Sequence, residues 1–122
     1  MSWKPSALIV EDQPFLGLIA AEILEEAGFE TFHAFGAADA VAVLRAHPEI
    51  EVLLAEANLS GAVNGVELAR IVSREGRKIR TVLTASEQIG SAVPEGIAIL
   101  RKPYSTADLR ALVGAVAVPE DA

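Results

Sequence analysis

Short apolar runs that stop abruptly at a charged residue recur along this chain. Residues 7–10 read ALIV and stop at Glu11, and residues 52–55 read VLLA and stop at Glu56. A run that is short and apolar at every position is typical of a strand covered on both of its faces. Strands of this kind belong to parallel sheets, whose connections run over both faces. No other feature of the sequence constrains the fold as strongly.

The segments between these runs have helical spacing. After Pro14, at a first helical position, apolar residues recur three and four apart until Gly28. Residues 38–46 and 66–75 predict two further helices, whereas residues 85–96 contain two glycines and a proline, so we expect any helix there to be short or irregular. The last predicted helix is capped by Ser105 and has the apolar stripe Leu109, Leu112, Val113 and Val116.

Three more strands, at residues 29–34, 79–83 and 97–100, complete an alternation of five strands with helices. We therefore predict an α/β protein with a five-stranded parallel sheet, doubly wound as in the flavodoxin-like (βα)5 fold. A length of 122 residues fits one domain, with a core at about residues 6–118 and no output domain.

Charge and composition narrow the possible functions. Ten Lys and Arg against seventeen Asp and Glu give a net charge of -7, which repels nucleic acid phosphates, so no nucleic acid partner is expected. The sequence has no cysteine for a disulfide or a thiolate metal site, no apolar run long enough to span a membrane and no signal-peptide core. We expect a cytoplasmic protein without a membrane partner.

The residues that end the strands form a chemically coherent set. Parallel strands place their carboxyl ends at one edge of the sheet, where ligands bind in folds of this class. Glu11, Asp12 and Glu56 would then share this edge with Thr84 and Lys102. Crowded carboxylates favour a hard divalent cation with oxygen ligands, usually Mg²⁺, and a hydroxyl with an ammonium suits the oxygens of a phosphoryl group. These residues predict an acidic Mg²⁺ pocket beside a phosphoryl site.

Five segments at these positions carry a resemblance to a known family. In chain order they are ALIVED at 7–12, VLLAEANL at 52–59, NGVEL at 64–68, VLTA at 82–85 and LRKPY at 100–104. With these segments the chain resembles, over residues 7–116, the receiver domains of response regulators in two-component signalling, including the chemotaxis receivers.

The resemblance implies a role for each residue of the pocket. Asp12 would bind Mg²⁺ directly, Glu11 would act mainly through water, and Thr84 and Lys102 would hold the phosphoryl group. The peptide bond before Pro103 would be cis. The implied metal ligands are Glu11, Asp12, Glu56 and the backbone carbonyl of Asn58.

Two residues depart from the family pattern. Glu56 stands where the family has its phosphorylated aspartate, and Ile99 stands where it has an aromatic switch residue. The extra methylene of a glutamate moves the carboxylate by about 1 Å, an error that can cost roughly a hundredfold in rate. We therefore expect Glu56 to be a phosphomimetic or a non-phosphorylated acceptor position. The short segment at 85–96 predicts a remodelled output face.

The predicted function is that of a stand-alone receiver-type signalling protein of a phosphorelay, and not an enzyme. Its expected partners are a histidine kinase or a phosphotransfer protein, a downstream effector, and possible second copies of itself in a homodimer. The alternative is a small phosphatase or phosphotransferase of similar topology, but residues 11–13 lack the second carboxylate, two residues on, that such an enzyme needs. His33 and His47 are predicted to be surface residues.

Overall fold

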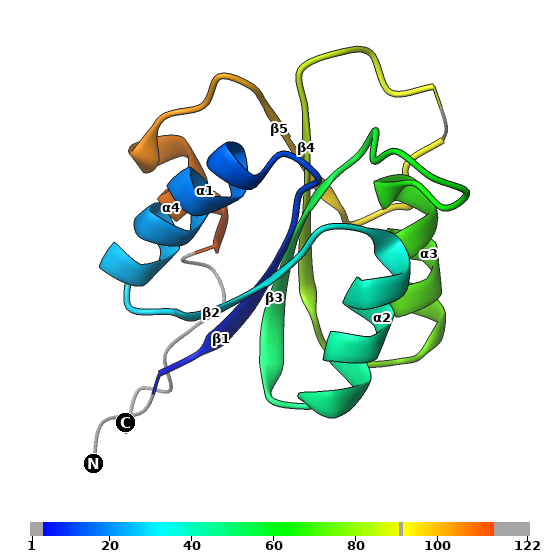
Figure 1. Ribbon diagram of the computed structural model, residues 1–122, viewed down its shortest axis with the longest axis horizontal. Helices are drawn as coiled ribbons and strands as arrows, with labels where there is room; N and C mark the ends of the chain where they lie inside the picture. The colour runs from blue at the N-terminus through cyan, green and yellow to red at the C-terminus, as the bar shows by residue number, and fades with distance from the viewer. Residues whose placement is uncertain (1–3, 91, 114–122) are drawn as a thin grey trace.

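The computed structural model describes residues 4–90 and 92–113, and its centre is a sheet of five parallel strands (Figure 1). The strand order is β2-β1-β3-β4-β5, so the chain begins near the middle of the sheet and adds strands on both sides. The predicted α/β fold class is confirmed. The strands are β1 (Ser6–Val10), β2 (Glu30–Ala34), β3 (Ile50–Glu56), β4 (Arg80–Ala85) and β5 (Ala98–Arg101).

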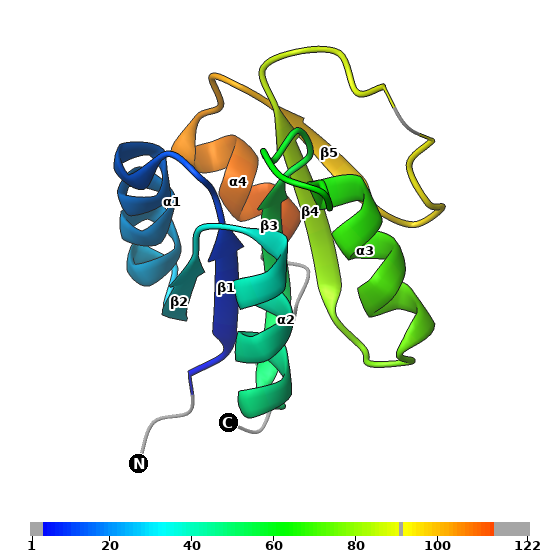
Figure 2. The same cartoon turned by 45° about the vertical axis from the view of Figure 1, so that its right-hand side comes forward.

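Helices cover both faces of the sheet and bury two apolar cores (Figures 1 and 2). Helices α1 (Pro14–Glu26) and α4 (Thr106–Val113) lie on one face, where Leu24, Leu54 and Leu109 pack together. Helices α2 (Ala37–Ala46) and α3 (Gly65–Arg74) lie on the other. The three central strands are buried at nearly every position, as the apolar runs predicted.

The strand register aligns the positions from which a site can be built. Val10 pairs with Ala55, Glu56 pairs with Thr84, and Ala85 pairs with Arg101. The residues that end these strands therefore lie in a row across one edge of the sheet. Because the edge is formed by buried strands, its side chains are held on a rigid base.

The connection between β4 and β5 has no regular structure. Residues 86–90 and 92–97, the part of it that the structure describes, contain no helix, so the predicted short or irregular segment is irregular. Its apolar side chains Ile89, Val93 and Ile97 nevertheless pack against the core on the α3 face. The Arg101 guanidinium also donates to the carbonyl of Glu87 at 2.7 Å. The wide loop is visible beside α3 in Figure 2.

Some expectations lie outside the described residues. One of these is the continuation of the last helix to Val116. Within the ranges that the structure covers, no helix is both long enough and apolar enough to cross a membrane.

Candidate functional site

Lys102 lies between two buried glutamates at the carboxyl edge of the sheet. Its Nζ donates to Glu11 Oε1 at 2.6 Å and to Glu56 Oε1 at 2.6 Å. Glu11 follows β1, Glu56 is the last residue of β3, and Lys102 follows β5, so three strands contribute to the contact. Glu11 is 6% exposed and Glu56 is 7% exposed. This is a partly buried ion-pair network, and its ammonium links carboxylates that would otherwise repel each other.

The remaining oxygens of both glutamates accept backbone hydrogen bonds. Gln13 N–H donates to Glu11 Oε2 at 3.2 Å, and Asn58 N–H donates to Glu56 Oε2 at 2.9 Å. Each of the four carboxylate oxygens therefore has a donor. Burial lowers the pKa of Lys102, but hydrogen bonds and charge interactions with the two glutamates outweigh it and raise this pKa above its ordinary value.

Asp12, next to Glu11 in the chain, takes its hydrogen bonds from another loop. Its Oδ2 accepts from the backbone N–H of Ser60 at 3.1 Å and from the Ser60 hydroxyl at 2.8 Å. Burial raises the pKa of Asp12, but hydrogen bonds from Ser60, together with those to Glu11 and to its own backbone, outweigh burial and bring this pKa below its ordinary value. No pattern in the sequence pointed to Ser60, because its role depends on how the loop after β3 returns toward β1.

Thr84 and the Lys102-Pro103 peptide bond also lie at this edge of the sheet. Thr84 is 3% exposed beside Glu56, and its carbonyl accepts from the N–H of Ala57 at 2.7 Å. The Lys102-Pro103 peptide bond is cis, as predicted. The N–H of Lys102 donates to the carbonyl of Ala85 at 2.9 Å, which anchors the start of this turn beside β4.

The side chains at this edge do not fit the predicted magnesium centre. Across residues 4–90 and 92–113, no three Asp, Glu, His or Cys side chains are grouped so that they could hold a metal ion. Glu11 and Glu56 are bound by Lys102, and Asp12 is bound by Ser60. Mg²⁺ in proteins binds through one or two carboxylates and keeps several waters, so it would have to compete with Lys102 and Ser60 for these oxygens.

His33, which was predicted to be a surface residue, is partly exposed and also contacts the backbone of the site. Its ring is partly buried, and Nε2 lies 3.2 Å from the backbone carbonyl oxygen of Glu11, to which it donates. The ring also lies 4.4 Å, centroid to centroid, from that of Phe35. This contact depends on the path of the chain after β1, which the sequence does not show.

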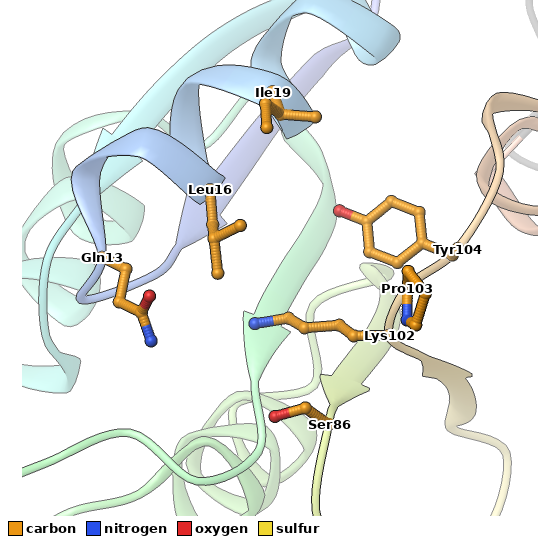
Figure 3. Close-up of a pocket in the computed structure, with 7 residues that line it drawn as sticks. All are labelled: Gln13, Leu16, Ile19, Ser86, Lys102, Pro103 and Tyr104. Atoms are coloured by element: carbon orange, nitrogen blue, oxygen red, sulfur yellow. The ribbon is translucent and has the colours of Figure 1, made fainter.

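A pocket of about 540 Å³ opens beside Lys102 (Figure 3). Leu16 and Ile19 of α1 form an apolar wall on one side, and Tyr104 faces them from the other. Lys102 extends from the β5 side between Gln13 and Ser86. The pocket gives a small molecule or a partner side chain a route to the ion-pair network. Its lining residues are Gln13, Leu16, Ile19, Ser86, Lys102, Pro103 and Tyr104.

Solved receiver domains share this fold. A response regulator receiver domain protein from Clostridium thermocellum matches with a TM-score of 0.81 and 18% identity, covering 90% of this chain and 91% of its own. A response regulator receiver protein from Sinorhizobium medicae WSM419 matches with a TM-score of 0.81 and 22% identity, covering 93% and 94%.

A third similar structure is the N-terminal domain of a response regulator/sensory box/GGDEF 3-domain protein from Carboxydothermus hydrogenoformans. It has a TM-score of 0.78 and 22% identity, covering 90% of this chain and 91% of its own. No protein-family model matches the sequence. At these identities, the resemblance to receiver domains is confirmed at the level of the fold.

Proposed function

We propose that this protein is a receiver-type signalling protein of a two-component phosphorelay, with Glu56 at the phosphoacceptor position. One observation carries the proposal: Glu56 ends a central strand of a receiver fold and contacts Lys102 at 2.6 Å across the strand edge. Thr84 flanks Glu56 on the neighbouring strand. An acceptor, an ammonium and a hydroxyl at one sheet edge are groups that support phosphoryl transfer to a carboxylate.

The glutamate at this position acts as a fixed charge. Its carboxylate already contacts Lys102, the group that would otherwise neutralise an incoming phosphoryl group, so the contact forms without a kinase. The module is then held in one state, either active-like or resting, and signals by docking. Histidine kinases, phosphotransfer proteins, effectors and a second copy of this chain remain the proposed partners, and the cytoplasm its proposed location.

The phosphatase alternative finds less support at the strand ends. Such enzymes use an aspartate nucleophile and a second carboxylate two residues on. Glu56 is followed by Ala57 and Asn58, and Glu11 by Asp12 and Gln13. We therefore propose a signalling module and not an enzyme. In the parent protein, with Glu56 bound to Lys102, magnesium has no part in this proposal.

Restoring the aspartate tests the proposal. Glu56→Asp shortens the side chain by one methylene, withdraws the carboxylate from Lys102 and opens space for a cation and a phosphoryl group. Incubation with acetyl phosphate and Mg²⁺ should add one phosphoryl mass to the variant and little or none to the parent, with a rate ratio of roughly a hundredfold. Mass spectrometry measures the adduct, which should be lost in alkali as an acyl phosphate is.

Glu56→Gln is the matched control, because it keeps the length of the side chain and cannot form an acyl phosphate. An aspartate variant that stays unmodified, under conditions that label a working receiver, would refute a phosphorelay origin for the site. A parent that labels as fast as the variant would refute the geometric argument about Glu56.

A further inference from the structure

The acidic pocket has its own cation. Lys102 Nζ lies 2.6 Å from one oxygen of Glu11 and 2.6 Å from one oxygen of Glu56. The Lys102 side chain is 14% exposed, so solvent screens these contacts only in part. We propose that Lys102 takes the place of a divalent metal in this pocket and excludes Mg²⁺ from it.

The first reason for this exclusion is that every carboxylate oxygen of Glu11 and Glu56 already accepts a hydrogen bond. The second oxygen of Glu11 accepts from Gln13 N–H at 3.2 Å, and that of Glu56 accepts from Asn58 N–H at 2.9 Å. A cation entering between the glutamates would compete with Lys102 and these backbone donors for the same oxygens. A buried donor that loses its acceptor carries a desolvation cost, which the metal would have to overcome.

Electrostatic repulsion is the second reason. The ammonium sits against both carboxylates, and a divalent ion bound to either one would lie within a few ångströms of it. Like charges at such distances repel strongly in a partly buried site. Asp12 would be the natural further ligand, but it already accepts two hydrogen bonds from Ser60. A metal ion in this pocket would therefore be repelled by the ammonium and would compete with existing hydrogen bonds at all three carboxylates.

This inference concerns the chemistry of the pocket and holds whether or not the protein serves in signalling. It predicts that removing the charge of Lys102 creates a metal site that the parent lacks. Two carboxylates would then remain without a counter-ion, which is the situation that favours a hard divalent cation.

The experiment titrates Mg²⁺, and separately Mn²⁺, into the parent, Lys102→Gln and Lys78→Gln, without a phosphodonor. Backbone amide NMR follows Glu11, Asn58 and their neighbours, and Mn²⁺ broadening reports on proximity. Lys78 is exposed, so Lys78→Gln makes the same change in net charge at a distance from the pocket. We expect Lys102→Gln to bind at least about tenfold more tightly than the parent and than Lys78→Gln.

Each other outcome overturns the proposal. A parent that binds as tightly as Lys102→Gln shows that the ammonium does not exclude metal. If none of the three proteins binds metal, the two glutamates do not form a metal site even without the ammonium. If Lys102→Gln and Lys78→Gln gain the same affinity, the change in net charge alone explains the effect.

Lys102→Gln could unfold, because it leaves two buried glutamates without a cation. Thermal unfolding of the same variants with and without Mg²⁺ covers this case. Refolding or a raised Tm with Mg²⁺ in Lys102→Gln alone supports the proposal, since a ligand that binds the native state stabilises it. An unfolded Lys102→Gln that Mg²⁺ does not refold refutes the proposal. Lys102→Met, which also removes the charge, is measured in the same way as a second variant.

Discussion

His33 connects the edge strand β2 to the acidic pocket. Its Nε2 donates to the carbonyl oxygen of Glu11. Strand β2 therefore helps to hold the backbone of Glu11, whose side chain belongs to the ion-pair network. The ring lies over Gly17 of α1, so closely that a Cβ built on Gly17 would lie 2.2 Å from His33 Cε1. A glycine inside a helix usually lowers stability. Here it provides the space that the imidazole occupies.

This packing predicts that, in a double-mutant cycle, Gly17→Ala changes the free energy of unfolding in opposite directions with and without the His33 ring. Gly17→Ala alone should displace the His33 ring, break its bond to Glu11 and lower the free energy of unfolding by about 1 kcal/mol. In a His33→Ala background the clash is absent, so Gly17→Ala should instead raise it by about 0.5–1 kcal/mol, the ordinary helix preference for alanine. Urea unfolding of the four proteins measures the cycle, and additive effects would show that the two residues are not coupled.

At the scale of single residues, the sequence predicted which side chains gather at the strand ends, and it did so from polarity alone. Glu11, Glu56 and Lys102 come together because parallel strands align their ends. The partners of Asp12 and His33 were not predictable in this way. They depend on the paths of two loops, and a loop path leaves no periodic trace in a sequence.

The connection from β3 to α3 is the element that fixes the position of Glu56. Asn64 caps α3 by accepting from Glu67 N–H at 2.9 Å, and the Glu67 carboxylate accepts from Asn64 N–H at 3.5 Å. Gly65 N–H donates to the Ala57 carbonyl at 3.0 Å, which brings the first turn of α3 against the end of β3. The approach is so close that a Cβ on Gly65 would lie 2.0 Å from the backbone oxygen of Glu56.

Gly65→Ala should therefore separate α3 from the end of β3. Because the clash is with backbone and not with a mobile side chain, we expect the free energy of unfolding to fall by about 1–3 kcal/mol. The matched control is Gly90→Ala, whose Cβ would meet nothing within 4 Å and which should stay within about 0.5 kcal/mol of the parent. Chemical denaturation compares the two, and equal stabilities would argue against the close packing at Gly65.

Elements were predictable where packing and local preference agree. The strands at residues 7–10 and 52–55 were recognisable because burial on both faces removes every polar residue, and their observed bounds extend by only one or two residues at some ends. The connection after β4 was predictable only as a weak element. Gly90, Pro94 and Gly96 disfavour a helix, while the contacts of Ile89 and Val93 with the core fix the loop instead.

The whole molecule combines two apolar cores with one charged edge. The cores on the two faces of the sheet stabilise the fold, whereas the charges at the carboxyl edge couple its stability to pH. Three groups near the pocket have shifted pKa values, and each shift adds a proton linkage between folding and pH. For Tyr104, burial raises the pKa, and the nearby charge of Lys102 partly opposes this.

The directions of these shifts predict that the free energy of unfolding is highest over a middle range of pH and falls at both acidic and alkaline pH. Lys102 and Tyr104 have raised pKa values, so their contributions are complete below the ordinary values of 10.5 and 10.0 and are lost as pH rises through the higher folded values. Asp12 has a lowered pKa, so its contribution is complete above 3.8 and is lost as pH falls through the lower folded value. Urea unfolding across a pH series measures both limbs.

Two variants assign the limbs to their groups. Lys102→Gln should flatten the alkaline limb while leaving the part due to Tyr104, because a glutamine has no proton to lose there. Asp12→Asn should flatten part of the acidic limb for the same reason, since its amide does not titrate and Ser60 loses a charged acceptor at every pH. A free energy of unfolding that rises with pH above 10.5 in the parent would contradict the raised pKa of Lys102, and with it the strength of its contacts to Glu11 and Glu56.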